Sequence, residues 1–336
     1  MKKLLALTLA LILSLGLLAG GVAEEGKTYR VALIVKSLSE AYATWLTDSV
    51  LNQAAENEEF SNLEITVFDS MQDATECVNN VELAVIQQFD IILIQKTGGF
   101  DTDELFTRVV TQDNIPIVTL NIPVTDDVSC NVAASNYDLG YTEGKYAAEV
   151  LPENANILII RGTVGDQETE RYNGMCDSLL KTRPDINILD EQIATYNRAE
   201  GMALMEDWLQ KFDDIDGVVS MNDGMALGAI EACLADPDFD MSECMFFGVD
   251  GLGDGCISIY EGYLTATVLQ DAEEMAYQGL VMVEKVLAGE VDGKEDYYIE
   301  SVLITKDNVN EYIDRHIENG ILDADQMREI GYEYEG

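Results

Sequence analysis

Histidine and closely spaced metal ligands are scarce in this chain of 336 residues. His316 is the single histidine, and no C-x-x-C pair or cluster of histidine and cysteine occurs. Because zinc is held by closely spaced cysteine and histidine side chains, we expect no metal site. The G-x-S-x-G motif of serine hydrolases and the glycine spacing of nucleotide-binding loops are also missing. We therefore expect no cofactor, and we expect a protein that is not an enzyme.

Basic residues are few as well. Lysine and arginine number 19 against 63 aspartate and glutamate residues, and the formal net charge is −44. A protein that binds DNA or RNA needs a basic patch to meet the phosphates, so this composition excludes nucleic acid as a partner. The acidic residues are spread along the chain, which predicts a well-solvated surface.

The long apolar run of the sequence lies at its start, from Leu4 to Leu18. Two lysines precede this run and Gly21-Val22-Ala23 follows it, as in a secretory signal with its cleavage site. We predict that residues 1–23 are a signal peptide, removed on export to the periplasm or to the extracellular face of the cell membrane. An uncleaved anchor is the alternative. Without this segment the chain keeps 17 basic residues against 63 acidic ones, a formal charge of −46.

Six cysteines are present, an even number that permits disulfides in an exported protein. Cys77, Cys176 and Cys233 lie in amphipathic stretches, where a buried free thiol is common. Cys233 and Cys244 flank an acidic loop, and they form the one disulfide pair that we consider. Six reduced thiols are the alternative.

From Tyr29 onward, apolar runs of strand length alternate with stretches of helical periodicity. Such alternation predicts parallel sheets with helices on both faces. The rhythm breaks near residues 133–136 and then restarts, which indicates two doubly wound, Rossmann-like α/β domains. The expected strands are 30–35, 63–68, 91–95, 116–121, 157–161, 186–193, 217–221, 245–250, 264–269 and 298–304. The main expected helices are 40–58, 73–88, 101–113, 136–150, 168–182, 199–211, 225–234 and 272–288.

Polar and aromatic side chains gather where the predicted strands end. Because ligands of open α/β sheets bind beyond the carboxyl ends of the strands, these side chains are expected to share one site. Planar amides, carboxylates, an arginine and two aromatics suit a neutral polyhydroxylated ligand, whose hydroxyls need donors and acceptors and whose ring face packs on an aromatic ring. The set includes Glu40, Tyr42, Gln95, Asn121, Arg171, Tyr196, Asn222, Asp250 and Gln270.

Some of these residues also have a purely structural interpretation. Tyr42 could be a packing residue at the start of a helix. Asp250 could cap the short helix that follows it, and Asp223 is expected to cap the helix before Met225. Arg171 could form a surface ion pair with Glu168, which would contribute little.

Four stretches carry a family resemblance: NIPIVTLN at 114–121, SMNDGMALGA at 220–229, FGVDGL at 247–252 and TATVLQD at 265–271. With them the chain resembles periplasmic sugar-binding proteins of the ribose/galactose type, the solute receptors of ABC importers. The resemblance covers nearly all of the chain after the signal segment. It implies a periplasmic binding protein of type I, with two α/β domains joined by three hinge crossings. The domains would comprise residues 28–135 plus 271–300, and 136–270 plus 301–336.

The resemblance also implies which side chains contact the sugar. Tyr42 and Tyr196 would stack on the ring from opposite sides, and the other contacts would hold its hydroxyls. The proposed set is Glu40, Tyr42, Asn121, Arg171, Tyr196, Asn222, Asp250 and Gln270. Whether Asp166 or Glu168 faces the ligand stays open, because the spacing before Arg171 is one residue shorter than in the family.

Within the family, the acid at Glu40, the aromatic at Tyr42 and the amide at Asn121 are similar to glucose/galactose receptors. The calcium loop of those receptors is missing, since residues 151–156 read only LPENAN. We therefore expect a monomeric receptor that captures a monosaccharide, preferably a hexose such as galactose or glucose, and delivers it to an ABC transporter permease. The alternatives are a sensory sugar receptor for a membrane kinase or chemoreceptor and, with less support, a secreted carbohydrate-active enzyme.

Overall fold

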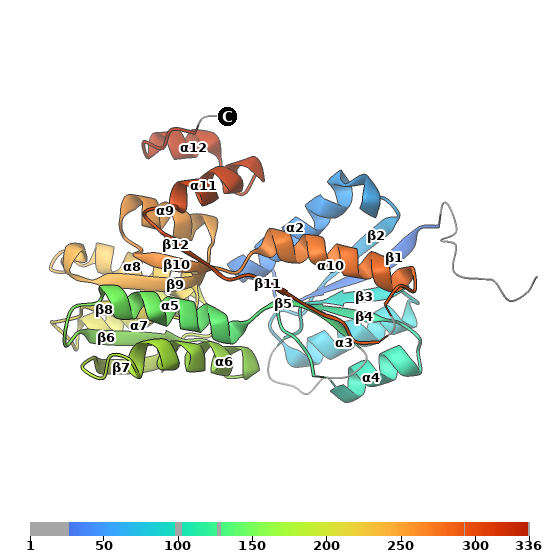
Figure 1. Cartoon of the computed structure of the whole chain (residues 1–336), viewed down its shortest axis with the longest axis horizontal. Helices are drawn as coiled ribbons and strands as arrows, with labels where there is room; N and C mark the ends of the chain where they lie inside the picture. Colours follow the sequence, from blue (N-terminus) through green and yellow to red (C-terminus); the bar gives the residue numbers. More distant parts are fainter. Residues whose placement is uncertain (1–26, 98–102, 126–128, 292, 335–336) are drawn as a thin grey trace, which may run out of the picture.

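A computed structural model describes residues 27–97, 103–125, 129–291 and 293–334. The predicted signal segment lies outside these residues. The described chain forms two six-stranded sheets, each flanked by helices, which lie side by side along the long axis of the molecule (Figure 1). This is the α/β architecture that the alternating pattern predicts.

The first sheet has the strand order β11-β5-β4-β3-β1-β2, and all of its neighbouring strands run parallel. Successive residues of β1 enter different cores: Val31 and Leu33 belong to one apolar cluster, and Ala32 and Ile34 to the other. This alternation shows that both faces of the sheet are buried, as a continuous apolar strand requires. The strands are β1 (Tyr29–Val35), β2 (Leu63–Asp69), β3 (Ile91–Ile94), β4 (Ile117–Leu120), β5 (Cys130–Ala134) and β11 (Asp296–Ile299). The helices packed on them are α2 (Ala41–Glu56), α3 (Ala74–Ile86), α4 (Asp103–Thr111) and α10 (Ala272–Leu287).

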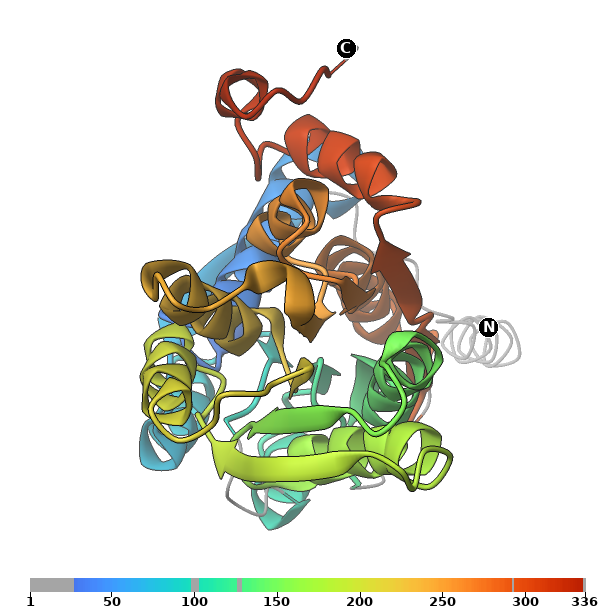
Figure 2. The same cartoon turned by 90° about the vertical axis from the view of Figure 1, so that its left-hand side faces the viewer.

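The second sheet has the order β12-β10-β9-β8-β6-β7. Figure 2 shows α5 and α6 to one side of it and α7 and α8 to the other. Its strands are β6 (Asn156–Arg161), β7 (Asn187–Ile193), β8 (Gly217–Ser220), β9 (Met245–Asp250), β10 (Ala266–Leu269) and β12 (Val302–Thr305). Its helices are α5 (Asn136–Val150), α6 (Asp166–Met175), α7 (Arg198–Leu209), α8 (Asp223–Ala235), α9 (Gly253–Glu261), α11 (Val309–Glu318) and α12 (Ala324–Glu329).

The structure corrects four expectations. The single strand expected at 298–304 is two strands, β11 in the first sheet and β12 in the second. The sequence pattern predicts no strand at Cys130–Ala134, but these residues form the buried strand β5. The second sheet is not wholly parallel, because β12 runs antiparallel to β10. The expected helix 168–182 also changes character, since α6 ends at Met175 and a single π-helical turn follows.

The chain passes from one sheet to the other at three places: between β5 and α5, between β10 and α10, and between β11 and β12. We call each sheet with its helices a domain; the exact domain bounds given above stay a prediction. The passages lie at carboxyl ends of strands, and they bring these ends of both sheets to the space between the domains.

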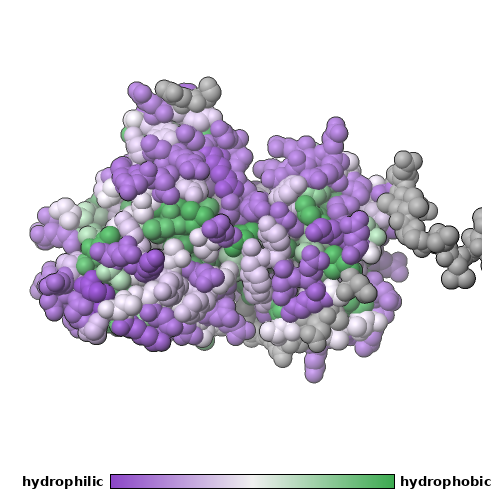
Figure 3. Space-filling model, in the orientation of Figure 1, coloured by the Kyte–Doolittle hydropathy of each residue, from purple (hydrophilic) through white to green (hydrophobic). Residues whose placement is uncertain are grey.

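The surface in Figure 3 is mainly hydrophilic, with apolar residues in separate patches. This agrees with a charge of −44 spread along the sequence. Among the described helices, none is both long and apolar enough to span a membrane.

Candidate functional site

The eight predicted contact residues lie on segments that follow the carboxyl ends of strands. Seven of them are buried, and the side chain of the eighth, Glu40, is 9% exposed. The first domain supplies Glu40, Tyr42 and Asn121; the second supplies Arg171, Tyr196, Asn222, Asp250 and Gln270. The sheet topology therefore places both sets toward the space between the domains.

Arg171 forms the centre of a buried hydrogen-bond network. Its guanidinium donates to the Met221 carbonyl at 2.6 Å and to Asn136 Oδ1 and Gln270 Oε1 at 2.9 Å each. Gln270 in turn donates from Nε2 to Asn121 Oδ1 at 2.8 Å. Because Asn121 follows a strand of the first sheet and Gln270 a strand of the second, this chain of bonds connects the two domains.

Asp250 ends β9 with its carboxylate 4.0 Å from the Arg171 guanidinium. Burial raises the pKa of Asp250 well above its usual range, although the Arg171 charge opposes that rise. The backbone at Asp250 has φ 131°, and Asn121 and Tyr196 have φ 66° and 62°. Non-glycine residues rarely adopt such values, and when they do they cluster at binding sites.

Tyr196 stands against the backbone of the second domain. A Cβ atom on Gly162 would lie 2.1 Å from Tyr196 Cζ, so only glycine leaves room for the ring there. On the side of the first domain, the Lys36 ammonium lies 4.8 Å from the centre of the same ring. The Tyr196 ring is thus held between the two domains.

Lys36 is a site residue that the sequence reasoning missed. It follows β1, is 7% exposed, and its Nζ lies 2.7 Å from Glu40 Oε2. The available signal was a lysine directly after a buried strand, four residues before a carboxylate. Lys36 and Arg171 are thus each accompanied by one carboxyl group, Glu40 at 2.7 Å and Asp250 at 4.0 Å.

The structure settles two alternatives around Arg171 and α8. Arg171 is 1% exposed and does not form a surface pair with Glu168, since Glu168 accepts from Arg161 Nε at 2.5 Å. Glu168 is buried, whereas Asp166 is exposed. The prediction that Asp223 caps α8 is wrong. The cap is Asn222, whose side chain accepts a hydrogen bond from the Met225 N–H.

Asp223 is a buried structural group instead. Its carboxylate accepts from the Leu252 N–H at 2.9 Å and from the Thr267 hydroxyl at 2.6 Å. Burial raises the pKa of Asp223 to about 7 despite these bonds. Asp223 therefore joins α8 to the ends of β9 and β10, immediately behind Asp250.

Several buried polar atoms at the site have no hydrogen-bond partner among the described residues. They are both amide atoms of Gln95, the Tyr196 hydroxyl and Arg171 Nε. Unsatisfied buried polar groups are rare in native proteins, because each costs about 1–3 kcal/mol. These atoms therefore keep hydrogen-bonding capacity that the described residues do not use.

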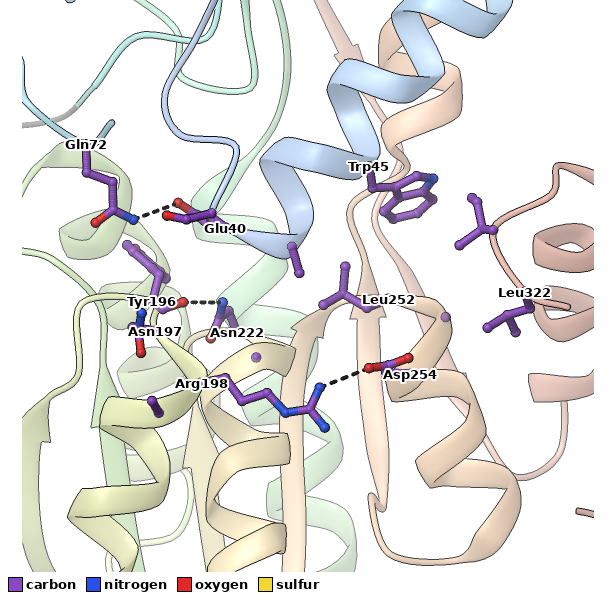
Figure 4. Close-up of a pocket in the computed structure, with 16 residues that line it drawn as sticks. Glu40, Trp45, Gln72, Tyr196, Asn197, Arg198, Asn222, Leu252, Asp254 and Leu322 are labelled. Carbon is purple, nitrogen blue, oxygen red and sulfur yellow. Dashed lines mark hydrogen bonds and ion pairs between the residues drawn. The ribbon is translucent and has the colours of Figure 1, made fainter. Parts of the chain in front are cut away.

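A pocket of about 480 Å³ opens next to this network (Figure 4). Glu40, Tyr196 and Asn222 line one part of it, and Trp45, Leu252 and Leu322 another. Three of the eight predicted residues therefore face a measurable cavity.

Cys233 and Cys244 are free thiols, so the considered disulfide between them is not formed. Within the described ranges, no group of three or more histidine, cysteine, aspartate or glutamate side chains is arranged to hold a metal ion.

Comparisons with known proteins agree with the fold and with the predicted family. The family model of the periplasmic binding protein domain matches residues 31–291. The ribose import binding protein RbsB of Escherichia coli is 29% identical over 292 residues, which are 86% of this chain and 94% of that protein. The xylitol-binding protein of Mycolicibacterium smegmatis is 29% identical over 317 residues, covering 92% of this chain and 87% of that protein.

Solved structures lead to the same family. A galactofuranose binding protein superposes with a TM-score of 0.79 at 21% identity, covering 87% of this chain and 99% of that chain. A solute binding protein of an ABC transporter from Bacillus halodurans, with bound myo-inositol, gives a TM-score of 0.76 at 26% identity, with the same two coverages of 87% and 99%. The resemblance inferred from the four sequence stretches is confirmed at the level of the family, while a glucose/galactose subclass is not. The chain therefore belongs to the periplasmic binding protein family, as a type I binding protein and not as an enzyme.

Proposed function

We propose that this protein captures a neutral monosaccharide between its two domains and delivers it to an ABC importer. The observation that carries the proposal is the buried network from Arg171 through Gln270 to Asn121, which connects both domains beside unpartnered polar atoms. A hexose such as galactose or glucose is the favoured ligand. The named ligands of the relatives, ribose and xylitol, are also neutral and polyhydroxylated.

The charges of the site support a neutral ligand. Lys36 is neutralised by Glu40 at 2.7 Å, and Arg171 has Asp250 at 4.0 Å. A charged ligand would compete with the Lys36–Glu40 pair, and a buried charge without its partner is costly. Hydroxyl groups, by contrast, both donate and accept, so they can bond to all four side chains while leaving the pairs in place.

The eight predicted contacts remain part of this proposal. Tyr196 would pack on the apolar face of the sugar, and the Lys36 ammonium beside its ring would bond to a hydroxyl. Because the ligand would contact both domains at once, it would favour the closed arrangement over an open one. An ABC transporter permease would then recognise the closed, monomeric receptor outside the cytoplasm, after removal of the signal segment.

Thermal unfolding of the mature chain, residues 24–336, tests the function directly. A ligand that binds only the folded state stabilises that state by mass action and so raises the melting temperature. At a ligand concentration of one hundred times the Kd, the free energy of unfolding increases by about 2.7 kcal/mol. We expect a shift with galactose or glucose and none with nucleosides or amino acids. A shift confined to ribose, xylitol or myo-inositol would refute the hexose preference alone. The absence of any shift with all of these sugars and polyols would contradict the proposal.

Asp250 provides the test of the site. Asp250→Asn keeps the shape of the side chain but replaces one carboxyl oxygen with an amide nitrogen, which cannot accept a hydrogen bond. We expect sugar affinity to fall by about 1–3 kcal/mol, or roughly five- to 150-fold, measured by isothermal titration calorimetry. Asp207→Asn is the matched control, since Asp207 is exposed in the last turn of α7 and is not among the proposed contacts. Equal affinity of both variants and the wild type would remove Asp250 from the site.

A further inference from the structure

The pocket of Figure 4 extends beyond the residues that the proposed function uses. We call it the outer pocket. Glu40, Tyr196 and Asn222 line it, whereas Arg171, Asp250 and Gln270 do not. The outer pocket therefore shares three side chains with the proposed sugar contacts and none with the buried network around Arg171.

The part of the outer pocket away from these polar residues is apolar. Trp45 from α2, Leu252 from the start of α9 and Leu322 from the segment after α11 face one another there (Figure 4). The Trp45 ring is fixed by edge contacts with Tyr42 at 5.9 Å and His316 at 5.1 Å between ring centres. An apolar wall with one indole suits the face of a second ring.

The charged groups at the rim do not call for a charged ligand. Arg198 forms a 2.9 Å ion pair with Asp254 and a 2.6 Å pair with Glu231. Glu40 is paired with Lys36. Each of these charged groups already has a partner of opposite charge within the protein, so the outer pocket offers hydrogen bonds at one end and apolar contact at the other.

We propose that the outer pocket is a second subsite, which holds a neutral ring attached to the bound sugar. This inference rests on the proposed function and makes a glycoside of the captured sugar the preferred ligand. The volume of the outer pocket, about 480 Å³, lies within the usual range for small-molecule sites, roughly 300–1,000 Å³. The attached ring is either a second sugar or an aromatic aglycone, since both present an apolar face.

Calorimetry with matched glycosides tests the subsite. For galactose and for glucose, the probes are the free sugar, its methyl glycosides, its p-nitrophenyl glycosides and a disaccharide that ends in that sugar, in both anomeric forms. We expect at least one p-nitrophenyl glycoside or disaccharide to bind ten or more times more tightly than the methyl glycoside of the same sugar. Tighter binding of a p-nitrophenyl glycoside identifies an aromatic aglycone as the attached ring. Tighter binding of a disaccharide identifies another sugar as that ring.

A filled pocket provides the matched variant. Ala199 is exposed on the first turn of α7 and lines the outer pocket, so Ala199→Trp would fill it without entering the buried network. We expect Ala199→Trp to abolish the tenfold advantage while methyl glycosides and free sugars bind as before. Ala235→Trp, at an exposed position at the end of α8 outside the pocket, should leave the advantage intact.

Fluorescence locates the attached ring independently. Trp45 lines the outer pocket, whereas Trp208 is 1% exposed within α7. A p-nitrophenyl group in the pocket should quench Trp45, and Trp45→Phe should lose that quenching. If free sugars bind and no p-nitrophenyl glycoside or disaccharide binds more tightly than the methyl glycoside, the subsite is refuted and the proposed function stands. If no sugar and no glycoside binds, the proposed function fails and the subsite fails with it.

Discussion

At the scale of single residues, Glu143 is the buried group whose role is least apparent from the sequence. It lies on α5, is 2% exposed, and neither carboxylate oxygen has a hydrogen-bond partner among the described residues. Burial raises its pKa well above the usual 4.5, with Arg171 opposing the rise and Asp223 adding to it. The folded protein therefore favours the protonated form of Glu143.

This raised pKa fixes the sign of a pH effect. Since the folded state binds the proton more tightly than the unfolded state, stability is lost as the pH rises above the unfolded pKa near 4.5. We expect Glu143→Gln to match the wild type near pH 5 and to exceed its free energy of unfolding near pH 8. The gain should grow steadily between these two pH values, because only the wild type loses the stability that comes from proton binding.

Urea unfolding at both pH values measures this difference. Glu149→Gln is the control, because Glu149 is exposed on the same helix. A gain of the same size for Glu149→Gln, or no gain for Glu143→Gln at pH 8, would contradict the assignment.

The position of a site residue in the chain decided whether the sequence could predict it. Asn121, Asp250 and Gln270 directly follow apolar runs, and an open α/β sheet brings such ends together. Lys36 stands at the same kind of position, but a lysine after a strand is ordinarily solvated, so its pairing with Glu40 had to come from the structure. The direction of a side chain depends on packing partners far away in the sequence, and sequence spacing does not contain that information.

At the scale of elements, the contact between α5 and α6 fixes the position of Arg171. A Cβ atom on Gly140 would lie 1.9 Å from the Arg171 carbonyl oxygen, and one on Gly174 would lie 2.1 Å from the Tyr137 carbonyl oxygen. The two helices therefore touch through backbone atoms. The guanidinium of Arg171 reaches its three acceptors only because the backbones come this close.

Gly140→Ala should push α6 away from α5. We expect a loss of about 1–3 kcal/mol in stability, the usual cost of overpacking, together with weaker sugar binding because Arg171 moves with its helix. Chemical unfolding and calorimetry measure the two effects. Gly165→Ala is the control, since no atom lies within 4 Å of its Cβ position and its φ of 167° is ordinary extended backbone. Unchanged stability and affinity for Gly140→Ala would show that α6 does not depend on this contact.

Periodicity predicted the long elements but not the short strands at the edge of each sheet. α2, α10 and β9 have strong apolar patterns and lie close to their expected positions. β11 has four residues, three of them exposed, and β12 has four, so neither shows a pattern that distinguishes two strands from one. Their separation follows from pairing with β5 and β10, which are remote in sequence.

At the scale of the whole molecule, 63 acidic residues against 19 basic ones make self-repulsion a general destabilising force. Salt screens this repulsion, since the Debye length falls from about 30 Å at 0.01 M to about 3 Å at 1 M. We expect the melting temperature to rise by about 3 °C, or about 1 kcal/mol for a chain of this size, when NaCl is raised from 20 mM to 0.5 M. Calorimetric scans should show the same rise with KCl. A fall would mean that ion pairs such as Arg315–Asp271 at 2.6 Å outweigh the repulsion.

The order in which the sheets are completed has a consequence for synthesis on the ribosome. The first sheet is built from β1 to β5 and closed by β11, and α10 covers one of its faces; these last two pieces lie between Ala272 and Ile299. The whole second sheet except β12 is translated in the interval. Chains normally fold domain by domain from the N-terminus during synthesis. Here the amino-terminal half emerges with an open sheet edge and an uncovered face, and both halves reach completion within the same last few dozen residues.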